Sequence, residues 1–127
     1  MKYPILSLIG FIVLVLTIPG TTIEITNAQE PYIQTIRTTA SWYGIESCVE
    51  KECLMANGEK FDENKITCAS RQFYGRTLKI EYQGKIIECL VTDKISKTYD
   101  NIRIDLSKKA FEILENLDKG LITITIY

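Results

Sequence analysis

The chain has 127 residues with 15 basic and 16 acidic side chains, a formal net charge of −1 and no histidine. This balance leaves no basic field that would recruit nucleic acid, and the lack of histidine excludes histidine-dependent catalytic triads. The length corresponds to about one domain once a targeting segment is set aside.

The N-terminal residues differ in composition from the rest of the chain. Met1 and Lys2 precede the uncharged run PILSLIGFIVLVLTI, and Thr26 and Ala28 occupy the minus-three and minus-one positions of a cleavage site. These are the features of a secretory signal peptide, and the apolar run is short for a membrane-spanning helix. We predict a signal peptide over residues 1–28, with an uncleaved membrane anchor as the alternative. The domain over 29–127 is then secreted, as a periplasmic, extracellular or cell-wall protein.

All four cysteines follow this segment: Cys48, Cys53, Cys68 and Cys89. An even number in an exported chain indicates two disulfides. The short segment SCVEKEC favours a bond between Cys48 and Cys53, which leaves Cys68 with Cys89, and the two other connectivities stay open. A zinc site is the competing interpretation, but without histidine or a CxxC spacing we predict neither a metal nor another cofactor.

The first half of the domain predicts two strands separated by a long loop. Residues 36–44, IRTTASWYG, are rich in β-branched and aromatic residues and end at glycine, which is typical of a strand. Residues 45–64 carry cysteines, charges and the turn signal Asn57-Gly58, and we expect a surface loop of the long kind that is often functional. Residues 66–70, ITCAS, predict a short strand.

The second half predicts a β-hairpin and two further strands. Residues 77–82 and 85–93 flank Gln83-Gly84, a pair suited to a tight turn with positive φ. Residues 102–105 predict a brief strand after a polar loop. Residues 121–127, LITITIY, alternate in polarity and predict the last strand.

One helix is predicted between the last two strands. Ser107 is suited to be its N-cap, and Gly120 to end it. Apolar residues follow at helical spacing: Ala110, Phe111, Leu114 and Leu117. Six short strands and one helix in about a hundred residues predict a mainly β fold, a small closed or nearly closed barrel. We expect a monomer.

The strand over 85–93 ends in a candidate catalytic group. Its apolar row leads to Asp93, and a second carboxylate, Asp105, follows after the polar loop. A partly buried carboxyl beside another acid can retain a proton near neutral pH and donate it to a substrate. The alternative is structural, because an aspartate at a strand end often caps a turn or pairs with a lysine such as Lys94 or Lys97.

Five short motifs occur in a characteristic order: ASWYG at 40–44, MANGEKFD at 55–62, ITCAS at 66–70, VTD at 91–93 and RIDLSKKAF at 103–111. In this order they resemble the rare lipoprotein A type (RlpA-like) double-psi β-barrel domain, over nearly all of residues 29–127. Residues 91–120 also resemble the barrel domain of bacterial expansins, which loosen cell walls without cleaving them.

The resemblance implies a six-stranded double-psi β-barrel with lytic transglycosylase activity on peptidoglycan glycan strands. Such an enzyme cleaves between N-acetylmuramic acid and N-acetylglucosamine with a 1,6-anhydro product. The acidic positions of the family correspond to Glu59, Asp62 and Asp93. Asp93 is the expected acid/base, and the other two are expected to stabilise the developing positive charge or contact the substrate.

Other positions are candidates for substrate binding. Ser70 stands where the family has a histidine, and a serine can form a hydrogen bond but does not titrate near neutrality. Asp105 matches the second aspartate of expansins. Asn57 either serves its turn or contacts substrate, and Trp42 either stacks on a sugar or belongs to the core.

Three functional hypotheses follow. The first is a lytic transglycosylase centred on Asp93. The second is a non-catalytic, expansin-like module that binds or loosens cell-wall glycan, which Ser70 favours. The third is a disulfide-stabilised secreted module that binds a protein, such as an inhibitor.

Overall fold

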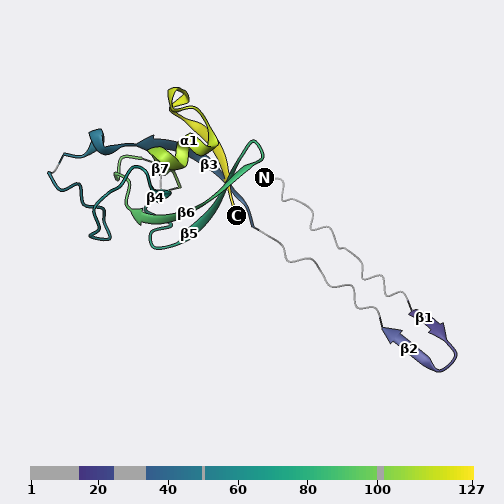
Figure 1. Ribbon diagram of the computed structural model, residues 1–127. Helices are drawn as coiled ribbons and strands as arrows, with labels where there is room; N and C mark the ends of the chain where they lie inside the picture. The colour runs from purple at the N-terminus through teal and green to yellow at the C-terminus, as the bar shows by residue number, and fades with distance from the viewer. Residues whose placement is uncertain (1–14, 25–33, 50, 100–101) are drawn as a thin grey trace, which may run out of the picture. The chain divides into compact units, whose positions relative to one another are not determined.

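The computed structural model describes residues 15–24, 34–49, 51–99 and 102–127, with only the backbone described at 15–18 and 21–24. The chain forms two units, residues 1–32 and residues 33–127. In the first unit β1 (Val15–Ile18) pairs with β2 (Thr21–Glu24) as an antiparallel hairpin (Figure 1). The predicted cleavage positions Thr26 and Ala28 lie outside the described residues, so the signal peptide stays a prediction. None of the helices described has the length and apolar character needed to span a bilayer.

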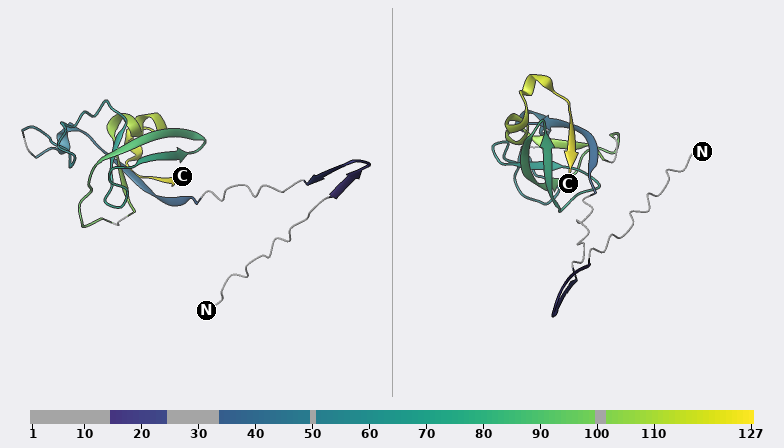
Figure 2. Two further views of the ribbon diagram at one scale, coloured as in Figure 1. Left: turned by 90° about the horizontal axis from the view of Figure 1, so that it is seen from below. Right: turned by 90° about the vertical axis from the view of Figure 1, so that its right-hand side faces the viewer.

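The second unit is a closed barrel of six strands (Figures 1 and 2). The strands are β3 (Ile36–Tyr43), β4 (Thr67–Ala69), β5 (Thr77–Tyr82), β6 (Lys85–Asp93), β7 (Ile104–Ser107) and β8 (Ile122–Ile126). Their order around the barrel is β3-β7-β4-β6-β5-β8, and β8 pairs with β3 to close it. β3 with β7 and β4 with β6 are parallel pairs, while the other neighbours are antiparallel. The predicted class, a mainly β six-stranded barrel with one short helix, is confirmed.

The predicted hairpin is confirmed at its exact bounds. β5 and β6 pair in an unbroken antiparallel register from Tyr82 opposite Lys85 to Thr77 opposite Leu90. Gln83 and Gly84 have φ values of 47° and 80°. Two successive positive φ values are the geometry of a two-residue hairpin turn, whose twist matches that of the strands.

The helix α1 (Lys108–Leu114) is shorter than predicted. Glu115 leaves it with extended backbone angles, φ −154° and ψ 163°. Asn116 then caps a separate 3₁₀ turn, Leu117–Lys119, because its side chain accepts a hydrogen bond from the Asp118 N–H. Gly120 ends this second turn with φ 68°, rather than ending α1.

The barrel interior and α1 share one apolar core. The strands contribute side chains at alternate positions, as period-2 packing requires. The fully buried large members are Ile80, Val91, Ile104, Leu106, Phe111, Leu114 and Ile124. Each is worth about 1.5–3 kcal/mol when removed from water, so the core fixes the strand ends that carry the polar residues discussed below.

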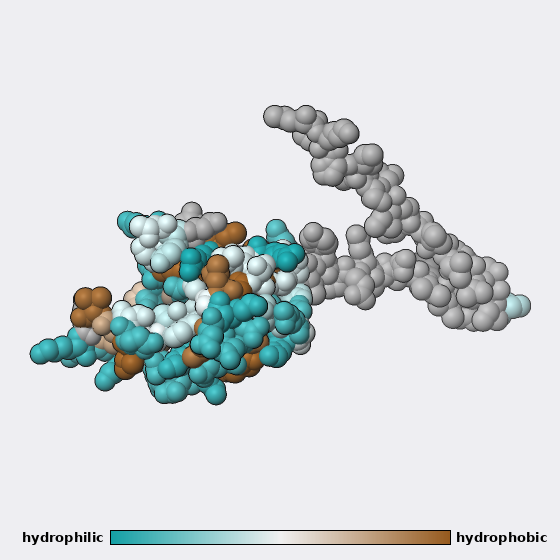
Figure 3. Space-filling model, turned by 90° about the horizontal axis from the view of Figure 1, so that it is seen from above, coloured by the Kyte–Doolittle hydropathy of each residue, from teal (hydrophilic) through white to brown (hydrophobic). Residues whose placement is uncertain are grey.

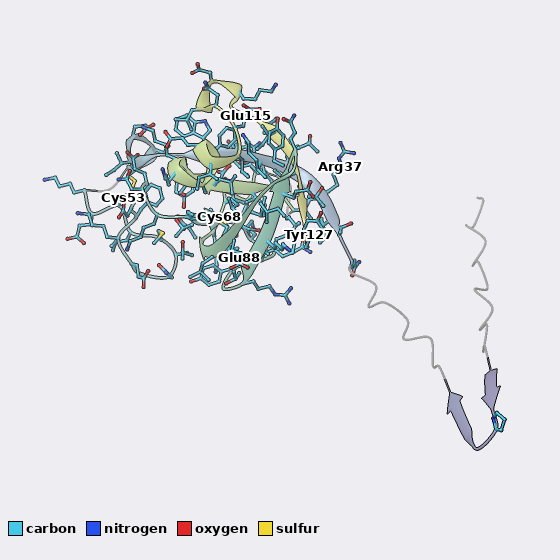
Figure 4. The ribbon with its side chains drawn as sticks, turned by 45° about the vertical axis from the view of Figure 1, so that its right-hand side comes forward. Arg37, Cys53, Cys68, Glu88, Glu115 and Tyr127 are labelled. Atoms are coloured by element: carbon cyan, nitrogen blue, oxygen red, sulfur yellow. A yellow bond between two sulfur atoms is a disulfide. The ribbon has the colours of Figure 1, made fainter. Side chains whose placement is uncertain are left out.

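One of the two predicted disulfides is present. Cys48 and Cys53 are bonded, whereas Cys68 and Cys89 are free thiols buried inside the barrel (Figure 4). Cys68 pairs with Val91, so Cys89 is a diagonal neighbour. Burial, and then a hydrogen bond with Cys68, raise the pKa of the Cys89 thiol and keep it protonated.

Ser107 joins the start of α1 to the strand before it. Its fully buried hydroxyl donates to the Lys65 carbonyl at 2.6 Å and accepts from the N–H groups of Ala110 and Thr67 at 3.3 Å. The predicted N-cap is therefore confirmed, and the same oxygen also serves β4.

We predict that Ser107→Ala lowers the free energy of unfolding by about 2 kcal/mol, because it removes the helix cap and leaves the N–H of buried Ala110 without its partner. Urea denaturation measures this. The matched control is Ser96→Ala, at an exposed serine whose hydroxyl forms hydrogen bonds with Thr98, and its effect should stay within about 0.5 kcal/mol. Equal effects of the two substitutions would contradict the assignment.

Candidate functional site

Two aspartates lie at one end of the barrel, on the two strands that flank β4. Ala69 on β4 pairs with Asp93 on β6 and with Asp105 on β7. Since adjacent strands are about 4.8 Å apart, the two aspartate Cα atoms are roughly 10 Å apart. The expected proximity of Asp93 and Asp105 is therefore found, although twelve positions separate them in sequence.

Asp93 fastens the long loop to the end of β6. Its Oδ1 accepts hydrogen bonds from the N–H groups of Ala56 at 2.9 Å and Lys94 at 2.8 Å. Beside it, the Asn57 N–H donates to the Thr92 carbonyl at 3.2 Å. The structural interpretation of Asp93 is therefore confirmed in part. Its carboxylate accepts hydrogen bonds at the end of a strand, but the donors are backbone N–H groups and not lysine side chains. Within the described part of the chain, its other carboxylate oxygen has no hydrogen-bond partner.

Asp105 belongs to a polar network with β3. The Ser41 hydroxyl donates to Asp105 Oδ1 and accepts from an Arg103 terminal nitrogen at 2.7 Å. Arg103 Nε lies 3.9 Å from Asp105 Oδ1, and its guanidinium stacks 4.3 Å from the ring centre of Tyr99. The network thus presents an acceptor and several donors on half-buried side chains.

A cavity of about 220 Å³ opens beside Asp93. We call it the Asp93 cavity, and its lining residues are Tyr43, Ser47, Cys48, Val49, Cys53, Leu54, Phe61 and Asp93. The rings of Tyr43 and Phe61 stack with their centres 4.5 Å apart. The lining therefore combines aromatic and apolar side chains with polar groups, and among the described residues Asp93 is the charged one.

The Tyr43 hydroxyl is buried and lacks a hydrogen-bond partner within the described chain. Burial is the largest cause that raises its pKa, followed by the negative charge of Asp93, with Asp105 a smaller contributor. The phenol therefore stays protonated, and both carboxylates lie close enough to act on it.

Glu59 and Asp62 do not line the Asp93 cavity. Glu59 is exposed at the turn, where its N–H donates to Asn57 Oδ1 at 3.0 Å. Asp62 is also exposed, and its carboxylate accepts from the Asn64 N–H at 3.0 Å. Asp62 lines a separate depression of about 420 Å³ together with Glu63. The expected convergence of these two acids on Asp93 is not found at the cavity.

The other predicted substrate-binding residues have structural partners. Ser70 is fully buried, and its hydroxyl accepts from the Phe73 N–H at 3.3 Å. Trp42 is partly buried against the core and donates from Nε1 to the Leu117 carbonyl at 3.0 Å. Asn57 is exposed and forms the turn with Gly58, whose φ is 85°. Only Asn57 of these three remains open to solvent.

Three residues that matter locally were missed in the sequence: Ser41, Glu63 and Arg103. Arg103 precedes Asp105 by two residues, and period-2 spacing could have suggested that they share a face. Glu63 had no such signal, because its partners are distant: it accepts from the Ile45 N–H at 2.9 Å and lies 4.0 Å from Lys108 Nζ. It ties the start of the long loop to the start of α1.

We predict that Tyr43→Phe raises the free energy of unfolding at pH 7 by about 1 kcal/mol, because it removes an unpaired buried hydroxyl. The raised pKa of the Tyr43 hydroxyl also makes this difference in stability depend on pH. Above the ordinary tyrosine pKa of 10.0 the unfolded chain loses a proton that the folded chain keeps, so the wild type loses stability there and the variant loses less. Urea denaturation at pH 7 and above pH 10 measures both effects.

The control for this prediction is Tyr74→Phe, at a tyrosine that is 37% exposed. It should leave the free energy of unfolding at pH 7 within about 0.5 kcal/mol of the wild type. A Tyr43→Phe protein that is less stable at pH 7 and as sensitive to alkali as the wild type would refute the assignment.

Comparisons with known proteins find similarity to solved structures. No family model matches the chain, and no curated protein does. The Streptomyces papain inhibitor matches with a TM-score of 0.61 and 24% identity, over 77% of this chain and 96% of the inhibitor. The apo expansin of Clavibacter michiganensis matches with a TM-score of 0.59 and 16% identity, over 74% of this chain and 50% of the expansin.

An aspartate-to-asparagine mutant of the same expansin, in complex with cellohexaose, matches with a TM-score of 0.58, 15% identity and the same coverage. At these identities the comparisons establish the barrel fold alone. The chain is thus similar in fold to a protease inhibitor and to the barrel of an expansin, and the RlpA-like resemblance rests on the sequence motifs.

Proposed function

We propose that this protein is a secreted, non-catalytic module that binds cell-wall glycan. The observation that carries the proposal is the pairing of both Asp93 and Asp105 with Ala69 at one end of the barrel. With Ser41 and Arg103 beside Asp105, this end offers hydrogen-bond donors and acceptors side by side. Sugar hydroxyls both donate and accept, so such a mixture of groups suits them.

Exposed aromatic rings flank the two aspartates. Tyr74 is 37% exposed and lies under the ammonium of Lys94, which is 4.6 Å from the ring centre. Tyr99 is 44% exposed and lies under Arg103. Lys94 follows Asp93 directly, and Arg103 precedes Asp105 by two residues. Tyrosine rings have apolar faces and a polar hydroxyl, so they favour ligands that are apolar on one face and carry hydrated polar groups on the other, as sugars do.

Support for cleavage is weaker than support for binding. A transglycosylase needs an acid and a base within reach of one glycosidic bond, and geometry is the first criterion. Near Asp93, Ser70 is buried, while Glu59 and Asp62 do not line its cavity. Asp105 is engaged with Ser41 and Arg103. Lytic transglycosylase activity is therefore the alternative that the experiment must test.

The relatives and the motifs support a glycan ligand. An expansin with this fold has been crystallised with cellohexaose. The RlpA-like motifs favour peptidoglycan strands as the ligand of this chain. The Cys48–Cys53 disulfide fits an extracellular location, where such bonds persist.

We predict that the purified protein sediments with insoluble peptidoglycan sacculi. Asp105→Asn should reduce the bound fraction about fivefold, because it weakens the charged network with Ser41 and Arg103. The control is Asp118→Asn, at an exposed aspartate in the 3₁₀ turn, which should bind as the wild type does. Absence of the wild-type protein from the pellet would refute glycan binding.

The soluble fraction of the same experiment tests cleavage. We expect no anhydro-muropeptides by mass spectrometry after incubation with the wild-type protein. Their release by the wild type, and not by Asp93→Asn, would instead establish a lytic transglycosylase.

A second candidate function is protease inhibition. The loop closed by the Cys48–Cys53 disulfide carries Val49, which is 100% exposed, and the exposed apolar side chains of Ile45 and Leu54 lie just outside it in the sequence. Figure 3 shows brown, apolar surface at the left end of the barrel unit. Apolar side chains on a covalently constrained loop suit docking to a protein, because little freedom is lost on binding. The papain inhibitor, matched over 96% of its length, points to a cysteine protease.

We predict that the protein inhibits papain in proportion to its concentration, and that Val49→Asp weakens inhibition about tenfold by placing a charge at the apolar contact. The control is Leu121→Asp, at a leucine that is 50% exposed outside this loop. Hydrolysis of a chromogenic peptide by papain is the readout. Full papain activity in a molar excess of the wild-type protein would exclude this function.

A further inference from the structure

We propose that the Asp93 cavity binds a lysine-type side chain of a peptide ligand, that is, an alkyl stem ending in an ammonium group. The cavity combines aromatic and apolar lining side chains with a carboxylate, Asp93, one of whose oxygens has no hydrogen-bond partner among the described residues. Neither the glycan proposal nor the inhibitor proposal uses this combination, and the inference stands apart from both.

The walls suit an alkyl stem. The stacked rings of Tyr43 and Phe61 form one part of the lining, and Leu54 and the Cys48–Cys53 disulfide form another. The volume of about 220 Å³ far exceeds the roughly 15 Å³ that a single water needs. A stem that displaces water from these walls gains from the removal of apolar surface from solvent.

The polar groups suit an ammonium. Asp93 uses Oδ1 for the N–H groups of Ala56 and Lys94, and its second oxygen is free of hydrogen bonds within the described chain. Tyr43 lines the same cavity, and its hydroxyl is buried and also without a partner within the described chain. An ammonium has three donors, so it can serve a carboxylate and a phenol oxygen together.

No cation of the described chain neutralises Asp93. Lys94 is the nearest in sequence, but its ammonium lies over the Tyr74 ring, and neither Lys94 nor Lys97 lines the cavity or forms an ion pair with Asp93 among the residues described. A ligand with a negative charge would be repelled, and a neutral alkyl ligand would leave the carboxylate and the hydroxyl unpaired. The cavity therefore selects an external cation with an apolar stem.

The test is a pair of NMR titrations of the purified full chain. The probe is Nα-acetyl-lysine methylamide, and the matched probe is Nα-acetyl-norleucine methylamide, which keeps an alkyl chain and lacks the ammonium. We expect the lysine probe to shift the backbone amide signals of Leu54, Ala56 and Phe61 saturably, with at least about tenfold higher affinity than the norleucine probe. Equal affinities, or no saturable shift with the lysine probe at millimolar concentration, would overturn the proposal.

The variant that tests the carboxylate is Asp93→Asn. Its amide oxygen can still accept from Ala56 and Lys94, so the substitution removes the charge and retains the loop contact. We expect its affinity for the lysine probe to fall to that of norleucine. The control Asp62→Asn, in the separate depression, should bind as the wild type does. Undiminished binding by Asp93→Asn would overturn the assignment even if the wild type binds.

An arginine probe, Nα-acetyl-arginine methylamide, distinguishes the head group. We expect weaker binding than with lysine, because a planar guanidinium has five donors and the cavity offers two unpaired acceptors. Tighter binding of the arginine probe would assign the cavity to guanidinium ligands and reject the lysine assignment.

Discussion

The hydrogen bond from the Ala56 N–H to the Asp93 carboxylate is the contact on which the functional end of this barrel depends. It joins the middle of a long loop to the last residue of β6, and the Asn57 N–H bond to the Thr92 carbonyl reinforces it. Because the loop is held there, Leu54 and Phe61 form the walls of a cavity beside the carboxylate. One side chain thus organises a loop and presents a charge, which explains why a structural and a functional interpretation of Asp93 are compatible.

The barrel carries two surfaces that suit different kinds of ligand. Asp105, Ser41 and Arg103 form a polar network suited to sugar hydroxyls. The disulfide-closed loop exposes Val49 fully, with exposed Ile45 and Leu54 on either side of the loop in the sequence, and these apolar side chains suit contact with a protein. The solved structures that share this fold include a papain inhibitor, and an expansin of which half the length matches and which was crystallised with cellohexaose.

The sequence predicted local structure well where short-range rules decide it. The hairpin around Gln83-Gly84 and the Ser107 cap follow from turn and cap chemistry, and both are confirmed. The predicted end of the helix at Gly120 was wrong, because Asn116 caps a separate 3₁₀ turn before that residue. At the site, the motifs predicted the approach of Asp93 and Asp105, but not that Ser70 is buried or that Glu59 and Asp62 lie outside the cavity. Those outcomes depend on how the long loop over residues 45–64 packs against the barrel, and the periodicity of the sequence does not predict this packing.

The position of β3 in the barrel has a consequence for folding. This strand is the first of the six to be synthesised, yet its two neighbours, β7 and β8, are the last. Its backbone N–H and C=O groups therefore stay without their native strand partners until almost the whole chain is available. The β5–β6 hairpin can form early, whereas closure of the barrel must wait for the C-terminal residues, so a chain truncated before β8 would expose an open edge prone to aggregation.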